Sequence, residues 1–364
     1  MLLEMGIGDA YGACFESCDR KHVERNNDLR YDIHPRNLKK HPEDVMPSLV
    51  PRGHYTDDTQ MTIGNIEMML ERPRFFERTP YPWESDGDVT ESDIVSFRRI
   101  HWRKVKEIFA DKYLEVFKRN ERRGYTMYLL HTLMNSVSGK DLLSKLNGKS
   151  DKSGAFMRAP PFGFYEDVND VIISADMQAR VTHDSWVGRH SSVGAALMTH
   201  YFYHKLGPKE DLVTWMKDLP SWVENDWPYH GREICNFSNL HSDEAFEVQA
   251  VRFNQDGQEK IVEDMVQPWK PGRRVRVHGW DCLESAIYAI ERNDNMADIL
   301  KDCVSHTGDV DTNTAVAAAA ASCSEEIEQN IPSILVQNLE NGSFGRDFLD
   351  NLDKQFQEAF PCKS

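Results

Sequence analysis

Apolar residues recur at helical spacing along most of the chain. This pattern predicts helices over residues 1–18, 61–70, 96–118 and 126–146, the last with a break near Ser136 and Gly139. It also predicts two helices within 170–206, joined around residues 182–185, and further helices over 281–292, 296–304, 313–323, 333–340 and 344–360. No alternation of strands and helices favours a doubly wound sheet. The sequence therefore predicts an all-α fold.

Several stretches lack this periodicity. Residues 34–54 read as a loop, 72–95 as a charged surface excursion and 147–154 as a Gly/Ser-rich loop. Residues 221–279 are the least periodic, and 248–253 and 274–277 could be short strands or extended loop. We interpret residues 1–364 as a single domain with insertions at about 74–104 and 221–279.

Composition narrows the class of protein. A chain of 364 residues with 40% hydrophobic and 28% charged residues reads as globular and soluble, and it can bury a substantial core. Its net charge of −16 makes nucleic acid an unlikely partner, because that role usually needs a basic face. No apolar run reaches the length of a membrane span, and the first residues lack the features of a secretory signal. The seven cysteines are scattered without a C-x-x-C pair, so we expect free thiols and a cytoplasmic location.

Two acidic clusters lie more than 200 residues apart: Thr56-Asp57-Asp58-Thr59 and Asp309-Val310-Asp311-Thr312. Each directly precedes a helical pattern, so each alone could be an ordinary N-cap with an acidic first turn. Adjacent aspartates repel each other, however, and two such clusters together are more specific than either alone. If they converge, their oxygens suit Mg²⁺ or a similar hard cation.

Other residues near these clusters are weaker candidates. Glu16 could be an ordinary exposed side chain at a helix end or part of the site. Asp9 lies among small residues, so we expect it to be buried, hydrogen-bonded and structural. His183 is a candidate substrate contact at a helix junction, whereas His306 is interpreted as structural. The basic segment 270–276 reads as a solvated turn, with a phosphate or acidic partner as the alternative.

Taken in order, these motifs make the chain resemble the ADP-ribosylglycohydrolase family. The opening Gly8-Asp9-Ala10-Tyr11-Gly12 with Glu16 is similar to the family's G-D-x-x-G…E segment. Residues 55–61 (YTDDTQM) resemble its Y-T-D-D-T-x-M, and residues 154–160 (GAFMRAP) its G-x-x-M-R-x-x-P loop with the proline one place early. Thr182-His183 and residues 308–312 (GDVDT) resemble its T-H and G-D-x-D-T motifs. These motifs span nearly the whole chain.

The resemblance implies an all-α fold of orthogonally packed helices around a central dimetal cleft. It implies two Mg²⁺ ions, with Mn²⁺ in some members, whose ligands would be Thr56, Asp57, Asp58, Asp309, Asp311 and Thr312. Ser153, Gly154 and Met157 would lie in a loop that holds the diphosphate or distal ribose, with His183 near the substrate. Hydrolysis at an anomeric carbon needs an activated water, and either Glu16 or Asp309 could accept its proton.

The expected function is Mg²⁺-dependent removal of ADP-ribose from a modified acceptor, with arginine on a protein as the default. Serine, a nucleic-acid base and a small ADP-ribosyl compound remain open as acceptors. The spacing between the first acidic cluster and the M-R loop, and the 221–279 stretch, are longer than the family pattern suggests. Two rival readings are a catalytically silent relative that binds ADP-ribose and a dimetal hydrolase of phosphoesters.

Overall fold

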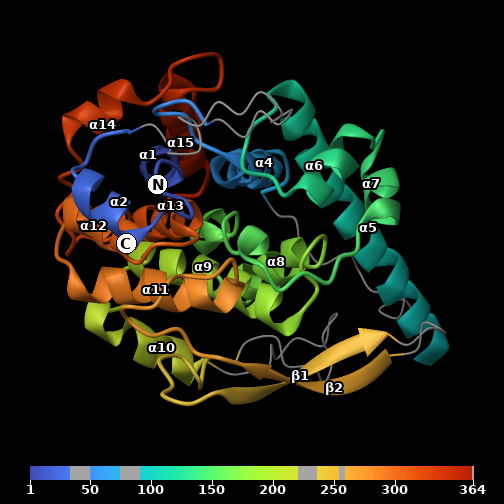
Figure 1. Cartoon of the computed structure of the whole chain (residues 1–364). Coiled ribbons are helices and arrows are strands. Elements are labelled where there is room, and N and C mark those ends of the chain that lie inside the picture. Colours follow the sequence, from blue (N-terminus) through green and yellow to red (C-terminus); the bar gives the residue numbers. More distant parts are fainter. Residues whose placement is uncertain (33–49, 74–90, 220–235, 254–258, 363–364) are drawn as a thin grey trace.

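Helices pack in several directions to form the body of the molecule, and one β-hairpin lies along an edge (Figure 1). The computed structural model describes residues 1–32, 50–73, 91–219, 236–253 and 259–362. The helices are α1 (Leu2–Ala13), α2 (Arg20–Asn26), α4 (Asp57–Glu71), α5 (Glu91–Arg119), α6 (Met127–Met134), α7 (Gly139–Lys145), α8 (Val168–Ala179), α9 (Trp186–Tyr203), α10 (Leu212–Asp218), α11 (Gly279–Arg292), α12 (Met296–Ser305), α13 (Val310–Ala321), α14 (Ser333–Asn338) and α15 (Arg346–Ala359). Short 3₁₀ turns cover Ser153–Ala155, Pro160–Phe164 and Lys209–Asp211.

The all-α prediction is confirmed, and so are most of the expected helices. The helix predicted over 1–18 is confirmed over Leu2–Ala13, but it ends earlier than expected, and a turn with Ser17 in the left-handed region separates it from α2. Helix α5 begins at Glu91, earlier than expected, and α2 and α10 were not predicted. The proposed loop 34–54 and excursion 72–95 lie largely outside the described residues, and the two insertions stay a prediction.

The β-hairpin occupies only part of the irregular stretch. Strands β1 (Phe246–Phe253) and β2 (Glu259–Val266) pair antiparallel, from Phe246 opposite Val266 to Phe253 opposite Glu259. The first strand agrees with the prediction at 248–253, and residues 274–277 take the extended-loop alternative. In that loop the buried Val275 makes one isolated bridge to Gly308. Its two arginines, Arg274 and Arg276, are exposed, which favours a loop at the surface over a sheet interior.

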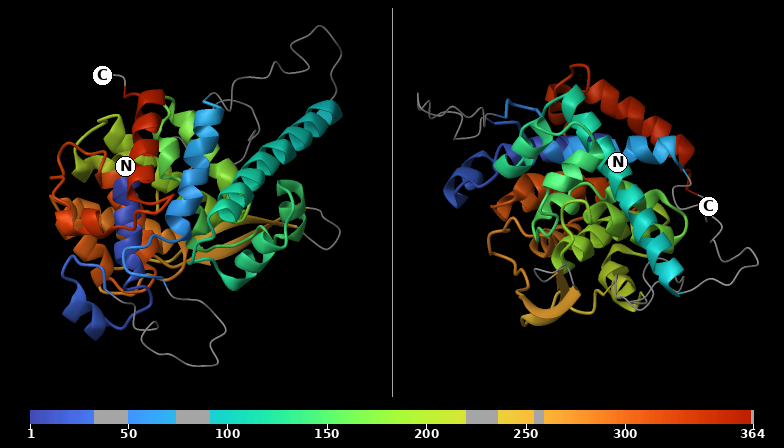
Figure 2. Two further views of the ribbon diagram at one scale, coloured as in Figure 1. Left: turned by 90° about the horizontal axis from the view of Figure 1, so that it is seen from above. Right: turned by 90° about the vertical axis from the view of Figure 1, so that its right-hand side faces the viewer.

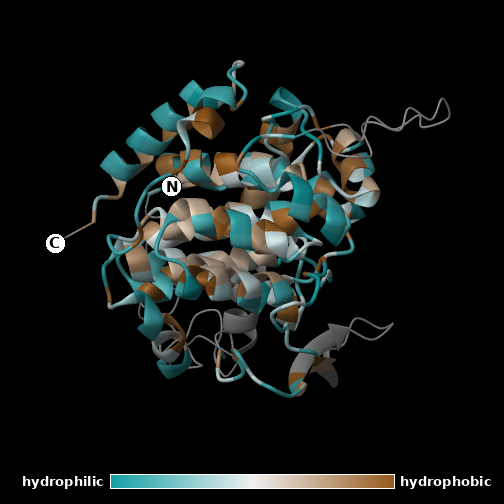
Figure 3. Cartoon of the chain, turned by 60° about the vertical axis from the view of Figure 1, so that its left-hand side comes forward, coloured by the Kyte–Doolittle hydropathy of each residue, from teal (hydrophilic) through white to brown (hydrophobic). Residues whose placement is uncertain are grey.

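Helix α13 lies at the centre of the helical body. All twelve of its residues are buried, and it contacts α1, α4, α9, α11 and α12. Its run of alanines has a high helix propensity and presents a thin surface, so several helices can approach it closely. Figure 3 shows the same organisation, since hydrophobic positions gather on the central helices and hydrophilic ones face outward. The Ala-rich segment predicted at 313–323 is therefore the inner helix of the fold.

Glycines allow α1 to lie directly against α13. A Cβ atom added to Gly12 would lie 2.4 Å from the carbonyl oxygen of Val310 and 2.5 Å from Cα of Asp311. Both neighbours are backbone atoms, so the contact cannot be relieved by a side-chain rotation. This close approach places the end of α1 beside the second acidic cluster.

Long helices α4 and α5 flank the central group. Helix α5 runs beside α4 at its carboxyl end and diverges from it toward its amino end (Figure 2). Where they meet, Nε2 of Gln60 donates to the carbonyl oxygen of Val116 at 3.0 Å, and Lys112 forms an ion pair with Glu71 at 2.6 Å. The Gln60 contact fixes the beginning of α4, which carries the first acidic cluster, and the Lys112–Glu71 ion pair fixes its end.

The described cysteines, at positions 14, 18, 282, 303, 323 and 362, carry free thiols, as their scattered spacing predicts. Throughout the described ranges, no helix combines the length and the apolar character that crossing a membrane requires.

Replacing Gly12 with alanine should lower the free energy of unfolding by about 1–3 kcal/mol, because the new methyl group collides with the backbone of α13. Gly64, inside α4, is a matched control: its added Cβ would only touch side chains of α5, at 3.4 Å or more. Gly64→Ala should be neutral or stabilising by up to about 1 kcal/mol. Urea unfolding of both variants checks this, and equal effects would contradict the close contact between α1 and α13.

Candidate active site

A single buried carboxylate joins α1 to the first turn of α4. Asp9 is fully buried and accepts hydrogen bonds from the backbone N–H groups of Thr56 and Thr59, each at 3.0 Å. It also accepts from the hydroxyl groups of the same two threonines, at 2.8 and 2.6 Å. Thr56 is the N-cap residue, but its hydroxyl does not cap the helix. Asp9 supplies that capping from another helix, which confirms its predicted structural role.

The first acidic cluster is positioned by this cap and by the segment after α5. The N–H group of Asp57 donates to the carbonyl oxygen of Arg123 at 2.9 Å. Gly124 lies so close to Asp57 that an added Cβ would meet the carboxylate oxygen Oδ1 at 1.8 Å. In Asp58, Oδ2 accepts from the Thr56 hydroxyl at 3.1 Å, whereas the buried Oδ1 has no hydrogen-bond partner among the described residues.

A strained turn delivers the second acidic cluster. Thr307 and Gly308 both have positive φ, 59° and 101°, and for the β-branched Thr307 this is costly. An added Cβ at Gly308 would lie 1.9 Å from the carbonyl oxygen of Val275, so only glycine fits. The N–H of Asp309 donates to that same carbonyl at 3.1 Å. The N–H of Ser17 donates to the carbonyl of Gly308 at 2.8 Å, which brings the turn containing Glu16 to this cluster.

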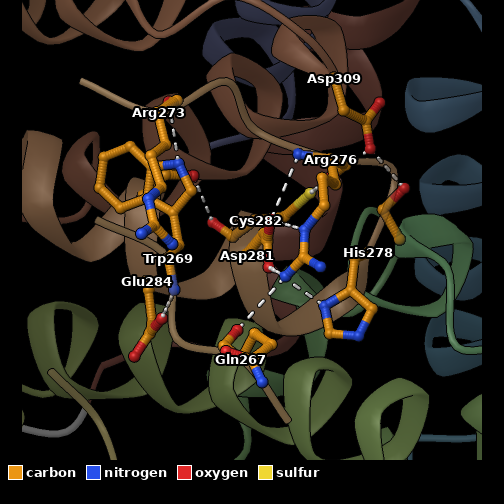
Figure 4. A network of polar contacts seen from close by, with 11 residues as sticks. Gln267, Trp269, Arg273, Arg276, His278, Asp281, Cys282, Glu284 and Asp309 are labelled. Atoms are coloured by element: carbon orange, nitrogen blue, oxygen red, sulfur yellow. Dashed lines mark hydrogen bonds and ion pairs between the residues drawn. The ribbon is translucent and has the colours of Figure 1, made fainter. Parts of the chain in front are cut away.

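One oxygen of Asp309 is held by two neighbouring side chains. The hydroxyl of Ser153 donates to Oδ2 at 2.6 Å, and the thiol of Cys282 lies 3.4 Å from the same oxygen. Figure 4 shows that Cys282 also lies beside Arg276, whose guanidinium is paired with Asp281 at 2.6 Å. The segment that follows the β-hairpin is thus linked directly to the second cluster.

The carboxylates of both clusters are close enough to raise one another's pKa. Burial is the largest cause of the raised pKa of Asp57, Asp58 and Asp311, and the charges of neighbouring acids raise it further. The charge of Glu16, which is only half-buried, contributes to the raised pKa of both Asp57 and Asp311. Thr312 lies within hydrogen-bonding reach of Asp58. The two clusters therefore converge, as the sequence suggested.

This oxygen-rich site has the chemistry of a hard-cation site. Within the described residues, no group of three His, Cys, Asp or Glu side chains stands in a ready-made metal-binding arrangement. Yet Asp58 and Asp311 each keep a buried Oδ1 without a hydrogen-bond partner in the described part of the chain, and such orphaned acceptors need a positive partner. With the hydroxyl groups of Thr56 and Thr312 nearby, the donor set consists of oxygen alone, which fits a hard cation.

The 153–157 segment lies against His183. A Cβ atom on Gly154 would be 2.8 Å from Cε1 of the imidazole and 3.1 Å from Nε2. Arg158 donates to the hydroxyl of Thr182 at 2.7 Å, and the same hydroxyl is hydrogen-bonded to Nδ1 of His183 at 2.6 Å, which fixes the orientation of the imidazole. Burial, and then the charge of Arg158, hold the pKa of His183 well below its usual value, so the ring is neutral at pH 7.

Several contributors to this region were not predicted. Arg158 is fully buried and donates hydrogen bonds to Gln178 on α8 and to Thr182, so it fixes the end of the 153–157 segment against that helix. Met157, which was predicted as a substrate contact, is buried in the core. Cys282 and the Arg123-Gly124 turn carry no sequence signal that would separate them from ordinary core and loop residues. The substrate-binding roles of Ser153, Gly154, Met157 and His183, and the catalytic roles of Glu16 and Asp309, stay predictions.

Comparisons with known proteins agree with the motifs. A sequence profile of the ADP-ribosylglycohydrolase family matches residues 1–363. No curated protein matches the sequence. Among solved structures, the chain is similar to one described as an "ADP-ribosylglycohydrolase-related protein complex", with 18% sequence identity and a TM-score of 0.55. That similarity covers 98% of this chain and 95% of the other, and at this identity it concerns the fold.

Two Asp→Asn changes should have opposite effects on stability when a chelator is present. Asp9→Asn removes acceptors from four donors, and it should lower the free energy of unfolding by at least about 2 kcal/mol. Asp311→Asn removes one charge from a buried group of like charges, and it should raise that free energy by about 1 kcal/mol. Denaturant unfolding at pH 7 in EDTA checks both. If both variants lost stability by a similar amount, the distinction between Asp9 as a structural residue and Asp311 as a member of the mutually repelling cluster would be wrong.

Proposed function

The chain belongs to the ADP-ribosylglycohydrolase family, a family of glycosyl-bond hydrolases, and on that basis we propose that it uses two Mg²⁺ ions to release ADP-ribose from a modified acceptor. The default acceptor is an arginine side chain on a protein. The observation that carries the proposal is the convergence of two buried acidic clusters, in which one oxygen each of Asp58 and Asp311 has no hydrogen-bond partner within the described ranges. Such a group of like charges is unfavourable on its own and is compensated by cations.

Six residues at the starts of two helices would hold the ions: Thr56, Asp57, Asp58, Asp309, Asp311 and Thr312. Their oxygen-only donor set suits Mg²⁺, and Mn²⁺ could replace it. When bound, such ions orient hydroxyl groups of the ribose and lower the pKa of a water molecule. The residues themselves keep the carboxylates at fixed positions, through the cap made by Asp9 and the turn at Thr307 and Gly308.

The loop beside the clusters is proposed to bind the ADP-ribose moiety. Ser153, Gly154 and Met157 would lie along its diphosphate or distal ribose, and the absence of a side chain at Gly154 lets the ring of His183 lie against this loop. His183 remains neutral and offers an N–H group rather than a charge. A neutral donor can bind a sugar hydroxyl without competing with the cations for the carboxylates.

Glu16 is the better candidate for the general base. Burial raises the pKa of Asp309, but its Oδ2 already accepts a hydrogen bond from Ser153 and lies beside the thiol of Cys282, so this oxygen is engaged by protein groups. Glu16 lies on a turn tied to the second cluster, and it is half-buried rather than enclosed. We therefore propose that Glu16 accepts the proton of the attacking water and that Asp309 orders the second cluster.

The first test is release of free ADP-ribose from ADP-ribosyl-arginine and ADP-ribosyl-serine peptides, from an ADP-ribosylated nucleic-acid base and from a small ADP-ribosyl compound. We expect release that requires Mg²⁺, stops in EDTA and falls at least about 100-fold in Asp58→Asn. Asp350→Asn, an exposed aspartate on α15, is the matched control and should keep full activity. Calorimetric titration with Mg²⁺ and Mn²⁺ measures ion binding separately from turnover.

Two other results would favour the rival functions. Tight ADP-ribose binding without turnover of any acceptor would favour a catalytically silent relative. Metal-dependent release of phosphate from phosphoesters, without release of ADP-ribose, would favour a dimetal phosphoesterase.

The proposed division between Glu16 and Asp309 is tested by their amide variants. Glu16→Gln should lower kcat by about 100- to 10,000-fold while the affinities for Mg²⁺ and ADP-ribose stay unchanged. Asp309→Asn should weaken Mg²⁺ binding as well as turnover. If Glu16→Gln keeps its rate, or loses cation binding to the same extent as Asp309→Asn, the assignment of Glu16 as the base is wrong.

A further inference from the structure

A basic cavity lies away from the acidic clusters, between α5, α7 and the end of α8. Its volume is about 420 Å³, within the range of small-molecule sites. Five of its lining side chains are cationic: Arg103, Lys106, Lys140, Lys149 and Arg180. We call this the flank pocket. Only two acidic residues line it, Glu107 and Asp184, so it carries three more positive than negative groups in a chain of net charge −16. Such a local reversal of sign attracts an anion.

The two acidic residues that line the flank pocket form only long ion pairs with its cationic side chains. Asp184 lies between Lys106 and Arg180, at 3.7 and 3.8 Å, and Glu107 lies 3.7 Å from Arg103. These distances exceed those of strong charge-assisted hydrogen bonds. Arg180 is anchored separately, because its Nε donates to Asp176 at 2.5 Å. Arg180 is thus fixed by a tight ion pair with Asp176, whereas the ion pair of Lys106 with Asp184 is long. Burial lowers the pKa of Lys106, which an added anion would counteract.

The remaining walls of the pocket favour a ligand with an organic part. Leu143, Leu146 and Val181 line it, and a bare phosphate ion would occupy only a small share of its volume. From this combination, we propose that the flank pocket binds a small phosphomonoester that carries a ring, such as a nucleoside monophosphate. Lys106, Lys140 and Arg180 contact the phosphate, and the apolar side chains contact the ring.

A backbone wall separates the flank pocket from the acidic clusters. Residues 148–150 lie beside 182–184, with Lys149 bridged to His183 and Ser150 N–H donating to the carbonyl of Thr182. On α5, Val116 contacts Gln60 near the first acidic cluster. Lys106 lies ten residues before Val116, which corresponds to about 15 Å along the helix. A ligand in the flank pocket therefore does not touch the carboxylates, and its binding is independent of the cations.

Calorimetric titration with AMP tests the proposal. Inorganic phosphate serves as a competitor, and adenosine serves as a control ligand that lacks the phosphate group. We expect AMP to bind, phosphate to displace it and adenosine to bind at least tenfold more weakly. Binding should persist in EDTA and in Asp58→Asn. Lys140→Met should weaken AMP at least fivefold and Lys106→Met/Lys140→Met at least tenfold, whereas Lys354→Met, an exposed lysine on α15, should change nothing.

Three results would overturn the flank pocket as a phosphomonoester site. They are no AMP binding at millimolar concentration, AMP binding that the lysine variants leave unchanged, and AMP binding that Asp58→Asn abolishes. The last would place AMP at the acidic clusters instead. Because Lys140 is exposed, Lys140→Met keeps the fold, and thermal unfolding of each variant verifies this. None of these measurements depends on turnover, so they stand apart from the test of the proposed hydrolase.

Discussion

The fold of the active-site region depends on the buried carboxylate of Asp9. Its two oxygens accept hydrogen bonds from two backbone N–H groups and two hydroxyl groups at the start of α4. An ionised group without water must be compensated by such donors, and here the donors belong to the residues that frame Asp57 and Asp58. Because Asp9 lies on α1, and α1 packs against α13 through Gly12, one carboxylate relates both acidic clusters to each other.

The arrangement stores unfavourable electrostatic energy at the site. Several aspartates with raised pKa lie together, and oxygens of Asp58 and Asp311 have no hydrogen-bond partner within the described residues. The strain continues in the backbone, where Thr307 has a positive φ. A tightly packed core supports these features, since the inner helix α13 is buried along its whole length. Sites that bind cations commonly sacrifice stability in this way, and the ion restores it.

The acidic clusters and the flank pocket divide the molecule into regions of opposite charge. The acidic clusters meet where α1, α4 and α13 converge, whereas the cationic side chains gather where α5 and α7 approach the end of α8. Residues 148–154 lie between the two regions, with Gly148 lining the flank pocket and Ser153 bonded to Asp309. The Gly/Ser-rich loop seen in the sequence is therefore the boundary between two environments.

The sequence by itself determined the helical class, the position of most helices and the two acidic clusters, because these depend on local periodicity and on short motifs. It also indicated that Asp9 is buried, since a carboxylate among small residues needs partners. Only the tertiary structure decided what those partners are, and which residues far apart in sequence support Asp309. Cys282, the carbonyl of Val275 and the Arg123-Gly124 turn act through contacts across more than 25 residues, and no local pattern records such contacts. The flank pocket has the same origin, because its cations come from two helices, the residue that follows α8 and a loop, which are ordinary charged surfaces until packing brings them together.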